Sequence, residues 1–235
     1  MFDKLKKAFS REPKAAVAAE AGGAPMSQMF GPVSEWAQTQ GFAIGLVGKG
    51  GAIALQGRVS ERPWRMEIGA PSRKYIRGEE LRARAELGIN DDVAVLVMNR
   101  TLKEALEKQA YAMFTDPLRT TADPNLPEEM RWLSMFEEVG WDSLPMPFWK
   151  RYSVLTDRRE NALAWVDPNL AELLMDWPDP GPGPEVPFLL LLLRGKGYLR
   201  MEYAPAQVPV LQHAALIFTS ACDSAVGSFS TDLSL

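Results

Sequence analysis

Few side chains in this chain of 235 residues could support nucleophilic catalysis, because it contains one histidine, His213, and one cysteine, Cys222. A Ser-His-Asp or Cys-His mechanism would have to pass through His213. His213 falls on the flank of a predicted C-terminal helix beside Ser220 and Ser224, where a lone histidine is usually structural. Cys222 falls on the apolar stripe of the same helix, where it is expected to pack as a small hydrophobe. We therefore predict no catalytic residue.

Carboxylate chemistry is a second option. Three pairs of adjacent glutamates occur, at Glu79-Glu80, Glu128-Glu129 and Glu137-Glu138. Adjacent side chains point in different directions on a helix or strand, so no pair alone forms an acid–base site. One cysteine and one histidine also fall short of the usual zinc ligand set. We predict no metal and no cofactor, and keep a carboxylate-based, metal-assisted enzyme as an alternative.

The glycines around Lys49 do not form a phosphate-binding loop. A Walker A motif needs a glycine five residues before Gly48-Lys49 and a serine or threonine after the lysine, whereas this chain has Ala43 and Gly50 there. The residues after Gly51 alternate as a strand does. These glycines are instead predicted to form a hairpin turn.

Positive charge is concentrated on predicted strands between residues 52 and 87. The residues concerned are Arg58, Arg65, Arg82 and Arg84. Successive side chains of a strand point to opposite faces, so arginines that alternate with apolar residues are expected on the face away from the core. We identify these four as a candidate anion-binding face. The alternative is a solvated face on which they pair with glutamates such as Glu67 and contribute little to stability.

One short motif occurs twice, as Arg65-Met66-Glu67 in 64–71 and as Arg200-Met201-Glu202 in 199–205. Each copy follows a glycine-basic pair, Gly57-Arg58 or Gly195-Lys196. In both copies the alternation predicts a strand with the methionine on the buried face and the charged residues on the other. The repeat suggests two related halves, at about 41–115 and 150–229.

The first residues form a basic amphipathic segment, 1–11. Its candidate binding residues for a membrane or protein partner are Phe2, Lys4, Leu5, Lys6, Lys7, Phe9 and Arg11. Such a segment can lie on an anionic membrane surface, where each Lys or Arg contributes roughly 1 kcal/mol. Residues 12–25 are rich in alanine, glycine and proline and are predicted to form a flexible linker.

The folded domain is expected over 26–235. Strands are predicted at 42–47, 52–59, 63–68, 81–87, 93–98, 151–156, 188–193 and 198–203. Helices are predicted at 28–39 (interrupted by Gly31-Pro32), from 101, at 127–140, at 168–175 behind an Asp167 cap, and at 208–229. Because the strands are joined as hairpins, the predicted fold class is α+β, with an antiparallel sheet, helices packed on one face and a long C-terminal helix.

Charge and hydropathy argue against some classes of function and location. A net charge of −4 argues against nucleic acid as a partner, since that requires clustered basic residues. The longest apolar run is six residues, Phe188–Leu193, which is too short to span a bilayer, and no secretory signal is recognised. The single cysteine suits a reducing compartment. We expect a cytoplasmic protein. If residues 1–11 bind the membrane, we expect it to be peripheral on the inner face.

The functional hypothesis is a non-enzymatic binding protein that docks on a membrane surface or a protein partner through its N-terminal segment. The main alternative is a carrier of a small molecule or lipid, with a pocket lined by tryptophans. The tryptophans concerned are Trp132, Trp141, Trp149 and Trp165.

Overall fold

The computed structural model describes residues 26–48, 52–114 and 128–230. The N-terminal segment 1–11 and the linker 12–25 therefore lie outside the described residues. The strands are β1 Ala43–Val47, β2 Ala52–Val59, β3 Arg62–Gly69, β4 Glu80–Glu86, β5 Ala94–Asn99, β6 Glu137–Val139, β7 Tyr152–Thr156, β8 Phe188–Leu193 and β9 Lys196–Glu202. The helices are α1 Met26–Thr39, α2 Arg100–Phe114, α3 Glu128–Met135, α4 Met146–Arg151, α5 Arg159–Trp165, α6 Pro168–Met175 and α7 Val208–Phe229.

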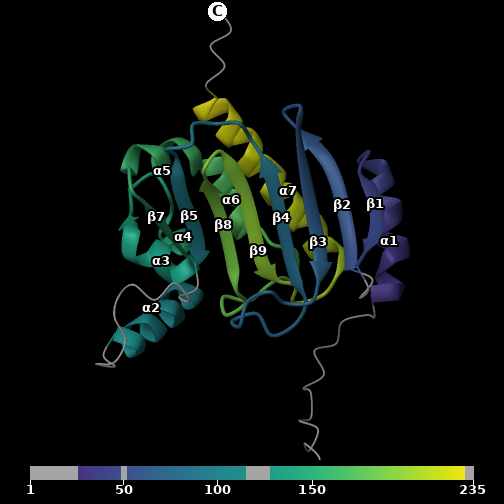
Figure 1. Ribbon diagram of the computed structural model, residues 1–235, viewed down its shortest axis with the longest axis horizontal. Coiled ribbons are helices and arrows are strands. Elements are labelled where there is room, and N and C mark those ends of the chain that lie inside the picture. Colours follow the sequence, from purple (N-terminus) through teal and green to yellow (C-terminus); the bar gives the residue numbers. More distant parts are fainter. Residues whose placement is uncertain (1–25, 49–51, 115–127, 231–235) are drawn as a thin grey trace, which may run out of the picture.

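All nine of these strands join one antiparallel sheet in the order β1-β2-β3-β4-β9-β8-β5-β7-β6 (Figure 1). The predicted α+β class is confirmed, including the long C-terminal helix. Strands from both predicted halves alternate in this sheet, because β9 pairs with β4 and β5 lies between β8 and β7. The two copies of the repeated motif lie on β3 and β9, and both strands pair antiparallel with β4.

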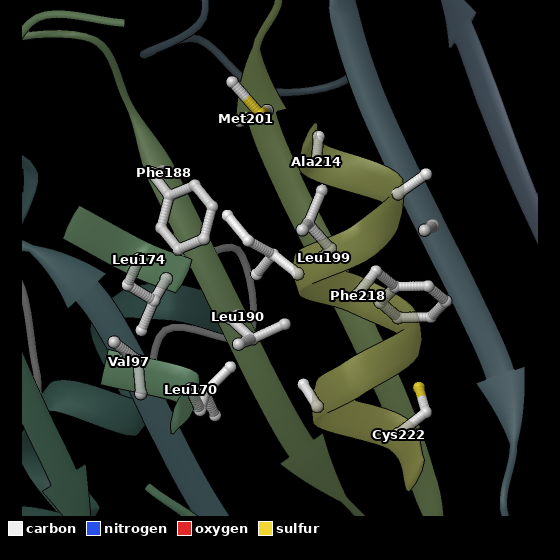
Figure 2. Packing of buried hydrophobic residues seen from close by; sticks show 14 of the residues in the cluster. Val97, Leu170, Leu174, Phe188, Leu190, Leu199, Met201, Ala214, Phe218 and Cys222 are labelled. Carbon is white, nitrogen blue, oxygen red and sulfur yellow. The ribbon is translucent and has the colours of Figure 1, made fainter. Parts of the chain in front are cut away.

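The larger core lies on the face of the sheet that α7 covers, behind the strands in Figure 1. Alternate strand residues such as Met66 and Met201 point into it, as the alternation predicts. Figure 2 shows Phe218 and Cys222 on α7, which packs over β9, and Leu170 of α6 beside Leu190 of β8. Helices α1, α4, α5 and α6 complete this layer.

A second, smaller core lies on the opposite face and is covered by α2 and α3. Strand β5 is buried on both sides: Val95 and Val97 point into the first core, and Leu96 and Met98 into the second. Such a strand has a continuous apolar sequence instead of an alternating one. The helical layer over this face stops at α3, where most outward residues of β9, β4 and β3 are charged and Tyr198 is an exception. The predicted arrangement, with helices on one face only, therefore holds for the β1–β4 side of the sheet.

Several predicted boundaries needed correction. Helix α1 runs unbroken from Met26 to Thr39 with Pro32 inside it, and the burial of Val33 and Ala37 in the larger core offsets the cost of the proline. Helix α3 ends at Met135 and not near Gly140, because residues 137–139 pair with β7 instead. Helices α4 and α5 were not predicted, since each has fewer than eight residues and shows little periodicity.

Candidate binding groove

The lone histidine and the lone cysteine both have structural surroundings. The Nε2 atom of His213 lies 2.7 Å from the carbonyl oxygen of Leu173, and its ring packs against Trp177 with the centroids 4.9 Å apart. Cys222 is buried in the larger core. Burial raises the pKa of its thiol, with the nearby Asp223 carboxylate adding to the shift, so the group stays protonated. His213 thus bonds a backbone carbonyl, and Cys222 packs as a core residue.

Two of the candidate carboxylates, Glu80 and Glu129, meet in a buried ionic cluster, which we call the α3 anchor. Its members are Arg73, Tyr75, Glu80, Glu129 and Arg200. The Oε1 atom of Glu129 accepts hydrogen bonds from Arg73 Nε at 2.7 Å, Tyr75 Oη at 3.0 Å and Arg200 Nη1 at 2.7 Å. Arg200 Nε lies 2.7 Å from Glu80 Oε1. The anchor therefore ties the first turn of α3 to β4, β9 and the β3–β4 connection.

Opposing effects act on the pKa of the Glu129 carboxyl group. Burial alone would raise its pKa, but the hydrogen bond from Arg73 and the positive charges of Arg73 and Arg200 outweigh it, so the pKa lies below its usual range. The anchor holds two arginines and two glutamates, so its charges balance. A charge-balanced network of this kind fixes a helix in place and keeps both carboxylates in ion pairs.

A groove of about 1120 Å³ runs along the edge of α3, over the uncovered part of the sheet. Its floor is formed by β2, β3, β4, β9 and β8, and α3 forms one wall. All four predicted anion-binding arginines line it: Arg58, Arg65, Arg82 and Arg84. The structure thus brings together residues that are up to 26 positions apart in the sequence.

Two of these arginines share one carboxylate. Arg65 donates from Nε to Glu67 Oε1 at 2.6 Å, and Arg82 donates from Nη2 to Glu67 Oε2 at 2.7 Å. Burial of Glu67 would raise its pKa, but hydrogen bonds from both arginines prevail and lower it. The guanidinium groups are thereby held in position while about 40% of each arginine side chain remains exposed, 40% for Arg65 and 42% for Arg82.

A second carboxylate, Glu86, is shared in the same way. It pairs with Arg84 in its own strand and with Lys196 of β9, whose Nζ atom lies 3.2 Å from Glu86 Oε2. Arg84 keeps 55% of its side chain exposed. Arg58 lies at the far end of the groove, where it contacts Glu61 in the β2–β3 turn.

The strand register places arginines directly opposite one another. Arg65 of β3 faces Arg84 of β4, and Arg82 of β4 faces Arg200 of β9. Directly opposed like charges destabilise a sheet, and the shared glutamates offset only part of that repulsion. The sequence suggested charge pairs between Arg65 and Glu67 on one strand and Arg84 and Glu86 on the next. The structure instead pairs Arg65 with Glu67 and Arg84 with Glu86 within each strand, and the cross-strand pair Arg82–Glu67 was not suggested.

The wall and the adjacent floor of the groove are apolar. Helix α3 contributes Trp132 and Met135, and Phe136 follows directly after it. Strand β8 contributes the outward side chains of Leu189, Leu191 and Leu193. Met135 has a relative exposure of 68%, so a large apolar side chain stands open to solvent at the rim. The groove therefore has an apolar flank and a cationic flank.

The lining has a charge opposite to that of the chain as a whole. Among its described residues are seven arginines and three glutamates, an excess of four positive charges, in a protein whose net charge is −4. Arg131 of α3 and Arg194 of the β8–β9 turn add positive charge at the helical side. The sequence did not single out these two residues, because the packing of α3 brings Arg131 to the strand arginines and the pairing of β9 with β4 brings the turn that holds Arg194.

The four candidate tryptophans do not surround one cavity. Trp132 lines the groove, whereas Trp165 is fully buried in the larger core and donates from Nε1 to the Ala221 carbonyl at 2.8 Å. Trp141 and Trp149 pack edge to face, with ring centroids 5.0 Å apart, against that same core. Core packing thus accounts for three of the four.

Over the ranges 26–48, 52–114 and 128–230, no cluster of acidic, histidine or cysteine side chains has the arrangement of a metal site. None of the helices in these ranges combines the length and apolar character needed to cross a bilayer. Comparison with known proteins found no matching family model, no matching curated protein and no matching solved structure.

Proposed function

We propose that this protein acts by binding, and that it holds an anionic partner in the groove beside α3. The observation that carries this proposal is the register of β3, β4 and β9, which sets Arg65 opposite Arg84 and Arg82 opposite Arg200. A solvated face needs no opposed arginines, since any polar residues would serve there and like charges cost stability. An anionic ligand would relieve that repulsion and so bind with a favourable electrostatic contribution.

The way in which the arginines are held supports this function. Glu67 and Glu86 together pair with four cations, namely Arg65, Arg82, Arg84 and Lys196. Two carboxylates therefore orient four cationic groups and neutralise half of their charge. Side chains fixed in this way lose less conformational entropy on binding than free arginines would.

An anionic aromatic probe, 8-anilinonaphthalene-1-sulfonate, tests the groove directly. We expect its fluorescence to rise on binding to the folded full-length protein, with an affinity that falls as salt is added. Reversing the charge of two exposed groove residues, in an Arg84→Glu/Arg131→Glu variant, should weaken binding by roughly tenfold or more, given about 1 kcal/mol for each nearby charge at a surface.

A matched control reverses two exposed basic residues outside the groove, Lys108→Glu and Arg158→Glu, and so changes the net charge equally. This variant should bind the probe with nearly the affinity of the unmodified protein. Equal weakening in both double variants would mean that the probe responds to overall charge, and the groove proposal would then be abandoned.

We also propose, from the sequence of residues 1–11, that the N-terminal segment docks the protein on an anionic membrane surface. A full-length variant with Lys4→Glu, Lys6→Glu and Lys7→Glu reverses three of its four basic charges. At roughly 1 kcal/mol per basic residue, binding to phosphatidylglycerol vesicles should fall on the order of 100-fold in flotation. The Lys108→Glu/Arg158→Glu variant, whose substitutions lie outside the groove, serves as the control, and equal flotation of the lysine variant and the unmodified protein would rule the docking out.

A further inference from the structure

We infer that the partner in the groove is an acidic amphipathic helix of another protein, which lies beside α3 and extends the helical layer over β9, β4 and β3. This inference rests on the proposed function, because it assigns a partner to the same groove. Its starting point is the incomplete helical layer: α2 and α3 cover β5 and β8, and the layer stops where the charged strands begin.

The space suits a helix. The floor from β8 to β3 crosses three strand spacings of about 4.8 Å, which gives a width of about 14 Å. A helix with its side chains measures about 10–12 Å across.

The apolar flank fits the apolar stripe of such a helix. Trp132 and Met135 form a ridge on α3, and Phe136, Leu191 and Leu193 continue it as the apolar floor beneath. Side chains spaced at i, i+3, i+4 and i+7 on the partner would pack against this ridge, as an amphipathic helix does in an apolar groove. Covering Met135 and Trp132 would also remove exposed apolar surface from water.

The cationic flank fits carboxylates on the neighbouring side of the same helix. Arg82 and Arg84 are two residues apart on β4 and point to the same face, so they lie about 6.7 Å apart along the strand. Acidic residues at i and i+4 of a helix are separated by about 6 Å along its axis. A helix that follows β4 can therefore place one carboxylate near each guanidinium group, with Arg65 and Arg131 beside them.

A nucleic acid fits this surface less well. Its phosphates repeat along the whole strand and require a basic track, whereas one flank of the groove is apolar and Glu67, Glu86 and Glu128 also line it. An acidic amphipathic helix instead has an apolar side and an acidic side, which match the apolar flank and the cationic flank of the groove.

The test uses the full-length protein as bait for a displayed library of helical peptides. Each peptide of roughly 18 residues, about 27 Å long as a helix, carries an apolar stripe at fixed positions and random residues elsewhere. We expect selection to enrich Asp and Glu on one flank of the stripe. The selected peptides should lose affinity at least roughly tenfold for the Arg84→Glu/Arg131→Glu variant and keep it for the Lys108→Glu/Arg158→Glu control.

Other outcomes would overturn the inference. Enrichment of basic or uncharged peptides would do so, as would acidic peptides that bind both double variants equally well. If no peptide is enriched while 8-anilinonaphthalene-1-sulfonate still binds in the groove, the helix assignment fails and the proposed function stands. Binding of phosphatidylglycerol vesicles that is lost in the Arg84→Glu/Arg131→Glu variant, without peptide enrichment, would assign the groove to lipid. Failure of every probe would remove both proposals.

Discussion

The arginines of the two copies of the repeated motif have different roles because their surroundings differ. Arg65 and Arg200 occupy the same place in the motif and both point away from the larger core. Arg65 keeps 40% of its side chain exposed in the groove, whereas Arg200 keeps 20% and ties α3 to the sheet. The sequence predicted the face correctly for both, but the burial of Arg200 depends on where α3 packs, which no local pattern reveals.

Glu129 carries a testable consequence of that packing. Its folded-state pKa is lowered from an ordinary value near 4.5, so its contribution to stability is fully present above that value and is lost as pH falls through the lowered pKa. A Glu129→Gln variant should lower the free energy of unfolding by about 2–3 kcal/mol at pH 7, because the half-buried Arg73 and Arg200 lose the carboxylate they share and keep only Glu128 and Glu80 as partners. The difference from the unmodified protein should shrink as the pH falls below about 4.

Urea unfolding at a series of pH values measures this effect. The neighbouring Glu128→Gln variant is the control, since Glu128 has 56% of its side chain exposed and its ion pairs should contribute less than about 1 kcal/mol. A loss at pH 7 that is similar for both variants, or a Glu129→Gln loss that does not change with pH, would contradict the role of the anchor.

At the scale of elements, the sequence predicted those with a long or unambiguous pattern. Strand β8 and helices α6 and α7 have the predicted bounds, and the Asp167 side chain accepts the expected capping bond from the Leu170 amide at 2.8 Å. The floor of the groove was predictable because alternation on β3 and β4 groups its arginines. Its wall was not, since the position of α3 depends on tertiary contacts such as that of Phe136 with the second core.

The β2–β3 hairpin contains an element-scale prediction. Gly57 of β2 lies directly opposite Trp64 of β3, and a Cβ atom at Gly57 would come within 2.8 Å of the Trp64 ring. Trp64 is buried and its ring lies edge to face with Phe218 of α7, so it has little room to move. A Gly57→Ala variant should therefore destabilise the protein by about 1–3 kcal/mol in thermal or urea unfolding.

Gly45 of β1 provides the matched substitution. It also lies in a strand, but a Cβ atom at Gly45 would meet no heavy atom of another residue within 4 Å, so Gly45→Ala should leave stability nearly unchanged. Equal stability of the two alanine variants would mean that the Trp64 ring is not packed tightly against β2.

For the whole molecule, the interleaved sheet argues against independent halves. The first predicted half contributes β5, whose two neighbours in the sheet, β8 and β7, come from the second half. Strand β9 of the second half in turn pairs along its length with β4 of the first. Each half alone would leave unpaired strand edges and an open core, both of which cost free energy.

We therefore expect the described domain to unfold in a single transition. Urea unfolding followed by tryptophan fluorescence and by far-ultraviolet circular dichroism should give coincident curves, because the tryptophans report on tertiary packing and the dichroism on the whole sheet. The Phe218→Ala variant, which removes a buried side chain of α7, should shift both curves together by about 3–5 kcal/mol. Separate transitions, or a shift in one signal alone, would instead show that the halves fold as independent units despite sharing one sheet.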